Sequence, residues 1–314
     1  MANRAFNDFI NNSEAAGLKL LYAQLRSGGQ ITDSFNLLPE QLRLNTYSLC
    51  KSVVGLTAGF AQQEGLISLD DKVCDILPDY VQPHTSSHLL ECRVRHLLTM
   101  SSGLGAPLFF ADMRDRYFVR DWAAYYFSVT FPHRPGTVFM YSNFNTYMVG
   151  RCIERRFGQP LLEYLRPRFF EPLGIGNPDW FSCPLGHTAA AYGLHVTIDE
   201  IGRFGEFVLR GGQWNGKQLL DEAYVREATS SQIDTLLCPA SLREVGFDPS
   251  LFQHGYGYQF WKTPLEGTIL SFGNYGQICL VMPDKNMVFC CQSFAGGPAA
   301  MDVYRLLLEA APGF

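Results

Sequence analysis

The sequence predicts an α/β fold of the α+β type, in which one antiparallel sheet is built from both chain ends and flanked by helices. Apolar strand patterns lie near the two termini, and helical patterns fill most of the middle. A Ser-x-x-Lys tetrapeptide opens an apolar helical run near the first strands. These observations favour a sheet domain from residues 1–65 and 208–314, a mainly helical domain inserted at 66–207, and an active site in the cleft between them.

The first 65 residues predict a helix, a strand hairpin and a second helix. Residues 6–14 follow a helical pattern, and residues 19–25 and 30–36 read as strands around a Gly-Gly turn. The second helix begins at Ser48, because apolar residues recur at helical spacing from there. Gly65 is placed to end it.

The middle of the chain predicts mainly helices, and the C-terminal part returns to strands. Residues 66–80 are rich in turn formers, and residues 89–207 follow mostly helical patterns. Residues 198–209 predict a further amphipathic helix. The expected interruptions are loops at 100–105, 131–137 and 174–178. Short apolar runs then predict three strands, at residues 268–272, 278–282 and 287–292. An amphipathic pattern over residues 301–311 predicts a closing helix.

Composition excludes several classes of function. The formal net charge of −5 and the lack of a basic stripe argue against nucleic-acid binding. No stretch approaches the roughly 20 apolar residues that cross a bilayer, so we expect no membrane partner. The first residues lack the apolar stretch and cleavage site of a signal peptide, which favours a cytoplasmic protein. The sequence is silent on oligomeric state.

The nine cysteines predict neither a metal site nor a disulfide framework. They are odd in number, scattered, and form no Cys-x-x-Cys pair. Most fall in apolar surroundings, as buried free thiols do. This usage is typical of a reducing compartment.

Ser48 and Lys51 are the candidate nucleophile and its proton acceptor. A helix places residues i and i+3 on one face, so the two side chains should meet. The hydroxyl would lie at the positive end of the helix, beside an amine that can take its proton. Two alternatives stay open: a helix-capping serine followed by a solvated lysine, and Cys50 as a competing nucleophile.

Two further motifs strengthen the catalytic interpretation. Tyr141-Ser142-Asn143 follows a Pro-Gly turn and precedes a helix, where a capping serine with a packed tyrosine is the alternative. A Gly-Asn-Tyr-Gly-Gln segment that begins at Gly273 lies between two predicted strands, where an ordinary hairpin is the alternative.

With these motifs in this order, the chain resembles the penicilloyl serine transferase superfamily. Within it, the likeness is to the β-lactamase-like serine hydrolases nearest to class C β-lactamases, a group with esterases, D-aminopeptidases and nylon-oligomer hydrolases. The resemblance covers nearly the whole chain. Its further matching segments are His96-Leu97-Leu98-Thr99-Met100-Ser101-Ser102-Gly103-Leu104, Pro135-Gly136, Phe170-Glu171-Pro172-Leu173-Gly174, Ala191-Tyr192-Gly193-Leu194 and Tyr256-Gly257-Tyr258.

The resemblance implies an acyl-enzyme mechanism without a metal or cofactor. Ser48 would attack a carbonyl, Lys51 would hold or accept the proton, and Tyr141 would serve as general base or relay. For that, the pKa of the tyrosine, ordinarily about 10, would have to be offset by Lys51. The backbone N–H groups of Ser48 and Gln277 would form the oxyanion hole, and Asn143 would contact substrate or Lys51.

The third motif departs from the family pattern. Lactamases commonly carry Lys-Thr-Gly where this chain has Asn274-Tyr275-Gly276. A neutral amide cannot supply the positive charge that helps to bind a substrate carboxylate. The change favours esters or uncharged amides, unless His254 or Lys262 replaces the charge.

The substrate side of the site is expected to be aromatic and apolar. Tyr258 and Tyr275 are predicted to face it, together with the third motif. The aromatic side chains that gather around the expected cleft, with a helical core as the alternative for most, are Phe109, Phe110, Tyr117, Trp122, Tyr125, Tyr126, Tyr256, Phe260 and Trp261.

The favoured function is therefore a serine hydrolase that cleaves a small-molecule ester or amide. Within that class, a β-lactamase or a penicillin-binding sensor that stays acylated is the alternative. A non-catalytic binding or assembly protein on the same fold is the alternative from another class.

Overall fold

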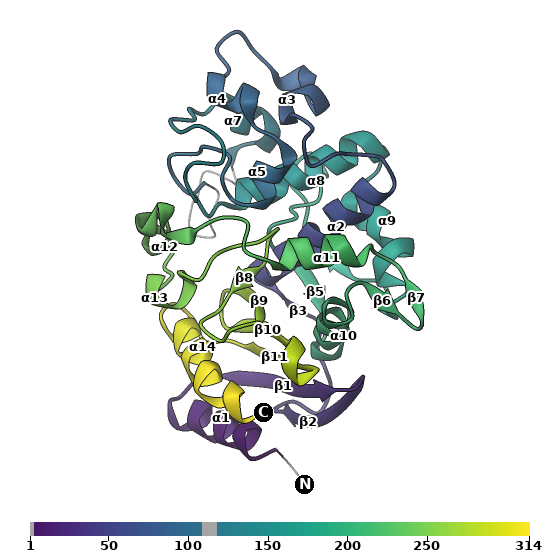
Figure 1. The fold of residues 1–314 in the computed structure, drawn as a ribbon, viewed down its shortest axis with the longest axis vertical. Helices are drawn as coiled ribbons and strands as arrows, with labels where there is room; N and C mark the ends of the chain where they lie inside the picture. The colour runs from purple at the N-terminus through teal and green to yellow at the C-terminus, as the bar shows by residue number, and fades with distance from the viewer. Residues whose placement is uncertain (1–2, 109–117) are drawn as a thin grey trace.

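A computed structural model describes residues 3–108 and 118–314, with the sheet towards one end and a group of short helices at the other (Figure 1). The six-stranded sheet has the order β2-β1-β11-β10-β9-β8, and its pairs are antiparallel. Both chain ends contribute to it, as predicted. Its strands are β1 (Leu20–Ser27), β2 (Gln30–Asn36), β8 (Trp261–Lys262), β9 (Ile269–Gly273), β10 (Gln277–Met282) and β11 (Met287–Ser293).

Helices cover both faces of this sheet. Because side chains alternate along a strand, Phe289 of β11 joins the core beneath α1 (Arg4–Ala15) and α14 (Ala299–Ala310). Val288 and Cys290 join the other core, beneath α10 (Ile198–Leu209). Burial on both faces explains why the C-terminal strands read as unbroken apolar runs.

The helix α10 lies close to the sheet because glycines face the strands. A Cβ on Gly205 would stand 2.5 Å from Val288 Cγ1 and 2.7 Å from Cys279 Sγ. One Cβ on Gly202 would meet the Arg26 side chain at 2.6 Å. The domain boundary predicted between residues 207 and 208 therefore falls inside a helix that packs on the sheet.

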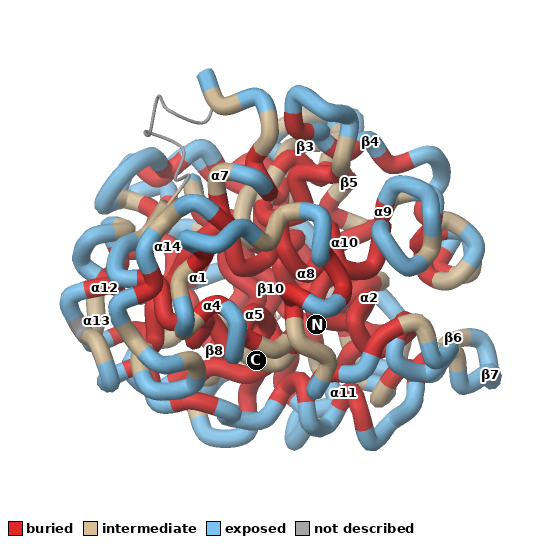
Figure 2. Tube along the Cα trace, turned by 90° about the horizontal axis from the view of Figure 1, so that it is seen from above, coloured by how far each residue is buried: buried red, intermediate tan, exposed pale blue. Residues whose placement is uncertain are grey.

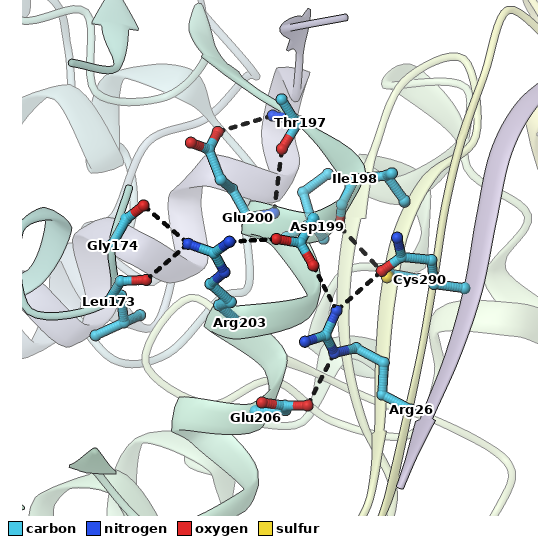
Figure 3. Close-up of polar contacts among 12 residues, drawn as sticks. Arg26, Leu173, Gly174, Thr197, Ile198, Asp199, Glu200, Arg203, Glu206 and Cys290 are labelled. Atoms are coloured by element: carbon cyan, nitrogen blue, oxygen red, sulfur yellow. Dashed lines mark hydrogen bonds and ion pairs between the residues drawn. The ribbon is translucent and has the colours of Figure 1, made fainter. Parts of the chain in front are cut away.

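A partly buried ion network ties α10 to β1 (Figure 3). Arg26 Nε donates to Glu206 Oε1 at 2.8 Å, and Arg26 Nη1 donates to Asp199 Oδ1 at 2.9 Å. Arg203 also pairs with Asp199 and donates to the Gly174 carbonyl at 2.8 Å. The network therefore fixes the sheet, α10 and the 173–174 turn together.

The helical region surrounds α2 (Cys50–Gln63), whose residues from Cys50 to Ala61 are all buried. Figure 2 shows α2, α8 and β10 within the buried interior. The other helices of the described chain include α3 (Val73–Ile76), α4 (Ser87–Glu91), α5 (Val94–Leu98), α7 (Trp122–Ser128), α8 (Asn143–Phe157), α9 (Leu161–Leu165), α11 (Glu222–Thr229), α12 (Pro239–Glu244) and α13 (Pro249–Phe252).

The helical prediction is wrong between residues 179 and 197. This segment holds β4 (Asp179–Trp180) and β5 (Leu194–Val196), which pair in one small sheet with β3 (Leu44–Asn45). Positive φ angles at Ala190 and Gly193 break any helical run there. A separate hairpin joins β6 (Gln213–Trp214) and β7 (Lys217–Gln218). Across residues 3–108 and 118–314, no helix is long and apolar enough to cross a membrane.

We expect Gly205→Ala to lower the free energy of unfolding by about 1–3 kcal/mol, because the new methyl overpacks the contact between α10 and the sheet. The direction opposes helix propensity, which favours alanine by about 1 kcal/mol. Chemical denaturation measures the change. Gly176→Ala is the control, since its Cβ would meet open space. A stabilised Gly205→Ala protein would contradict the close approach.

Candidate active site

Ser48 lies in a single 3-10 turn (Tyr47–Leu49) that leads directly into α2. The turn packs against β9 and β10. A Cβ on Gly273 would stand 2.2 Å from the Thr46 carbonyl oxygen and 3.0 Å from Leu49 N, so only glycine lets β9 come this close. Ser48 thus stands between the start of α2 and the end of β9.

Lys51 is buried and contacts Ser48, as the tetrapeptide spacing predicts. Its Nζ donates to Ser48 Oγ at 2.9 Å, to Asn143 Oδ1 at 2.7 Å and to the Ala191 carbonyl at 2.8 Å. The residue is 1% exposed, and burial lowers the pKa of the amine from 10.5 to about 7. The alternative of a solvated surface lysine is therefore wrong.

Tyr141 reaches Ser48 from the segment that enters α8. Its ring centroid lies 5.2 Å from Lys51 Nζ, and its hydroxyl hydrogen-bonds with Ser48. Burial raises the pKa of Tyr141 well above 10, and the hydrogen bond with Ser48 only partly opposes this. The raised pKa keeps the phenol protonated at neutral pH.

Cys50 does not have the surroundings of a nucleophile. Its thiol is fully buried and donates to the Ala190 carbonyl at 3.2 Å. Burial raises the pKa of this thiol to about 12, so it stays protonated and unreactive at neutral pH.

The third motif forms the turn between β9 and β10, beside Ser48. Asn274, Tyr275 and Gly276 make this turn, and Gln277 begins β10. The Tyr275 side chain is 39% exposed, and its ring packs on that of Tyr47, with the centroids 4.8 Å apart. The two N–H groups expected to form an oxyanion hole, on Ser48 and Gln277, thus come from neighbouring segments.

Tyr258 lies outside this group, contrary to its predicted position. It is 2% exposed, and its hydroxyl donates to Glu227 Oε1 of α11 at 2.6 Å. Its ring packs on Tyr224 of the same helix. The side chain therefore supports α11 instead of facing substrate.

The predicted aromatic lining is mostly support for the site. Trp261 and Tyr256 pack on Tyr141, with centroids 5.2 and 6.2 Å from its ring. Trp122 and Tyr126 are buried among the helices. Three of the predicted aromatics, Phe109, Phe110 and Tyr117, lie outside the described residues.

Lys262 does not replace the charge that Asn274 lacks. It pairs with Ile269, at the opposite end of β9 from Asn274. Five residues of extended strand separate those positions by about 16 Å. His254 lies at the same remote end, since its neighbour Gly255 accepts a hydrogen bond from Lys262 N.

Two groups that support the site were not predicted from the sequence. The Ala191 carbonyl accepts a hydrogen bond from Lys51, and in the sequence only the family resemblance of the Ala191-Tyr192-Gly193-Leu194 segment pointed to this region. Gln259, with φ +68°, accepts from Thr146 Oγ1 of α8 and donates to the Leu98 carbonyl of α5. Its own carbonyl accepts from Ser52 of α2, so it joins three helices behind Ser48.

Glu154 fixes the segment that carries Ala191. Its Oε1 accepts from Leu161 N and Thr188 N at 3.0 Å each, and its Oε2 accepts from Arg151 Nη1 at 2.8 Å. Burial alone would raise the pKa of this carboxyl. The hydrogen bonds, that of His187 foremost, together with the charge of Arg151, lower it below the usual value.

Comparison with known proteins identifies the family. The sequence matches the Beta-lactamase family over residues 20–310. The chain belongs to this family. The contacting side chains of Ser48, Lys51 and Tyr141 all lie within the matched residues.

Three known proteins are similar to this chain in sequence or in fold. "Lovastatin esterase" of Penicillium rubens is 25% identical over 202 residues, which cover 55% of this chain and 49% of the esterase. The chain thus spans about half the length of that relative. The structure of a "putative 6-aminohexanoate-dimer hydrolase from Bacillus anthracis" has a TM-score of 0.77 at 20% identity, covering 96% of this chain and 81% of that one. A "D-stereospecific amidohydrolase from Streptomyces sp." has a TM-score of 0.72 at 20% identity, covering 98% of each chain.

We expect Glu154→Gln to destabilise the protein at pH 7 by about 3–5 kcal/mol, because it removes the charge that balances buried Arg151. The pKa of Glu154 is lowered on folding, so its contribution is fully present above the unfolded pKa of about 4.3 and is lost as the pH falls through the folded value. Urea denaturation at pH 7 and at pH 3 measures this. An equal difference from wild type at both pH values would contradict it.

Proposed function

We propose that this protein is a serine hydrolase that cleaves a small ester or amide through an acyl-enzyme on Ser48. The observation that carries the proposal is the contact of the Lys51 amine with Ser48 Oγ at 2.9 Å, with a pKa lowered to about 7. An amine of this pKa is partly neutral at physiological pH, so it can take the serine proton.

In the proposed acylation step, Ser48 Oγ bonds to the substrate carbonyl carbon as its proton passes to Lys51 Nζ. The carbonyl oxygen becomes an oxyanion, held by the N–H groups of Ser48 and Gln277. Tyr141, protonated at neutral pH, donates its proton to the departing group and regains one from Lys51. The C–O or C–N bond then breaks, which leaves the acyl-enzyme.

Deacylation runs the same path in reverse. Water takes the place of the leaving group and gives a proton through Tyr141 towards Lys51. Its oxygen bonds to the acyl carbon, and the proton returns to Ser48 as the acid departs. Asn143 Oδ1 keeps Lys51 aimed at Ser48 throughout.

The third motif supports esters and uncharged amides over β-lactams. Asn274 offers an amide where family lactamases commonly place a lysine, and Lys262 lies at the far end of β9. A substrate carboxylate would therefore meet no compensating cation from either residue.

We expect wild-type protein to form a Ser48-linked adduct with a fluorophosphonate probe and to turn over p-nitrophenyl butyrate. Ser48→Ala should abolish the adduct and lower ester turnover by at least a factor of 10³. Intact-protein mass spectrometry over time measures the first, and nitrophenol absorbance the second. Ser34→Ala, at an exposed serine on β2, is the control.

The same experiment separates the alternatives. A penicillin adduct that persists for hours, without ester turnover, would indicate an acylated sensor. Rapid penicillin hydrolysis would indicate a β-lactamase. No adduct with any reagent would contradict the hydrolase proposal and favour a binding protein.

We expect kcat/KM for ester hydrolysis to rise with pH through a midpoint near 7, because neutral Lys51 is the active form. Below the midpoint, the rate should fall about tenfold per pH unit as the amine takes a proton. Lys51→Arg should lower the rate by about 10²–10⁴-fold, since arginine stays charged. A profile that is flat from pH 5 to 9 would contradict Lys51 as the proton acceptor.

A further inference from the structure

A cavity of about 250 Å³ opens beside the third-motif turn. It lies between this turn, the start of α14 and the segment that follows α12. The side chains that define its walls are Val245, Phe247, Tyr275, Pro298, Ala300 and Met301.

Two residues of the cavity wall pack against aromatic rings beside Ser48. Phe247 packs against the Tyr141 ring, with the centroids 5.3 Å apart. Tyr275 packs against Tyr47, the residue before Ser48. We therefore infer that one of the two arms of a substrate bonded to Ser48 extends towards this space.

The part of the substrate beside Tyr141 is the leaving group. This assignment rests on the proposed function, in which Tyr141 protonates the departing atom. Tyr141 gives its proton to the departing oxygen or nitrogen, so that atom must face the phenol. The substituent on that atom then points towards Phe247. This residue both packs against the Tyr141 ring and forms part of the cavity wall.

The lining favours an uncharged occupant. Among the described residues, no Asp, Glu, Lys, Arg or His lines the cavity, and the polar side chains of the lining are Asn274 and Tyr275. Burying an unpaired carboxylate here would cost more than burying an alkyl or aryl group.

The start of α14 does not turn the cavity into an anion site. The N–H groups of Ala300 and Met301 donate to the carbonyls of Gly297 and Pro298, at 3.2 and 2.9 Å. Asp302 adds a negative charge within the first turn. These contacts oppose the attraction that a helix N-terminus has for anions.

We propose that this cavity binds an apolar, uncharged leaving group, so that the substrates are esters or amides of an alkyl or aryl alcohol or amine. A cavity of about 150 Å³ accommodates benzene. This cavity of about 250 Å³ therefore suits a benzyl or hexyl group.

Acetate esters of different alcohols test this, because only the leaving group changes. Ethyl, butyl, hexyl and benzyl acetate are compared by kcat/KM, with acetate release followed in a pH-stat. We expect a rise of up to about fourfold per methylene as far as hexyl. The ester 6-acetoxyhexanoate, which ends in a carboxylate, should fall at least tenfold below hexyl acetate.

A cavity-filling variant localises the effect. Met301→Trp should lower the hexyl-to-ethyl ratio of kcat/KM at least fivefold. Glu309→Trp, at an exposed position of the same helix, should keep the wild-type ratio. Thermal unfolding shows whether both variants fold. If one does not, the comparison of hexyl acetate with 6-acetoxyhexanoate on the wild-type protein still tests the proposal.

The outcomes separate the two proposals. Ser48-dependent hydrolysis with no preference for apolar alcohols, or with 6-acetoxyhexanoate as the better substrate, overturns this inference and leaves the hydrolase proposal standing. Wild-type protein that releases acetate from none of these esters, and that forms no fluorophosphonate adduct, overturns both.

Discussion

The burial of one amine organises this site. Lys51 Nζ has three acceptors, which come from the turn before α2, from α8 and from the segment before β5. A charged amine in such a position loses its hydration, so its pKa falls to about 7. The protein thereby holds a base of near-neutral pKa against a serine hydroxyl. Each of the three segments must be in place for the amine to keep its partners, and much of the surrounding structure serves to fix them.

These segments are held in place by close approaches at glycines, by one glutamine with a positive φ angle and by buried ion pairs. Gly273 allows β9 to approach the serine turn, and Gln259 joins α2, α5 and α8 behind it. Glu154 holds the chain on which Ala191 lies. On the other side of the protein, Arg26 joins β1 to α10 (Figure 3). Polar groups buried in this way favour one arrangement, because any other leaves them without partners.

Patterns of local spacing carried the correct predictions. Short apolar runs bounded by turn residues predicted the strands of the sheet, and the three-residue spacing of Ser48 and Lys51 predicted their contact. The errors arise where direction or environment depends on distant residues. Tyr258 turns towards Glu227, and burial raises the pKa of Tyr141 whatever its neighbours in sequence. The sequence could not predict that the Ala191 carbonyl accepts a hydrogen bond from Lys51, because every residue has a backbone carbonyl and only the fold determines which one lies beside the amine.

The position of β1 has a consequence for how the chain folds. β1 pairs with β2 on one side and with β11, from the opposite end of the chain, on the other. During synthesis the N-terminal hairpin therefore emerges first and keeps an open edge until β11 leaves the ribosome. Such a long-range pairing is slow to form, and an unpaired strand edge invites association with other chains. Completion of the sheet therefore waits for the C-terminal strands, and one edge of β1 stays open until β11 pairs with it.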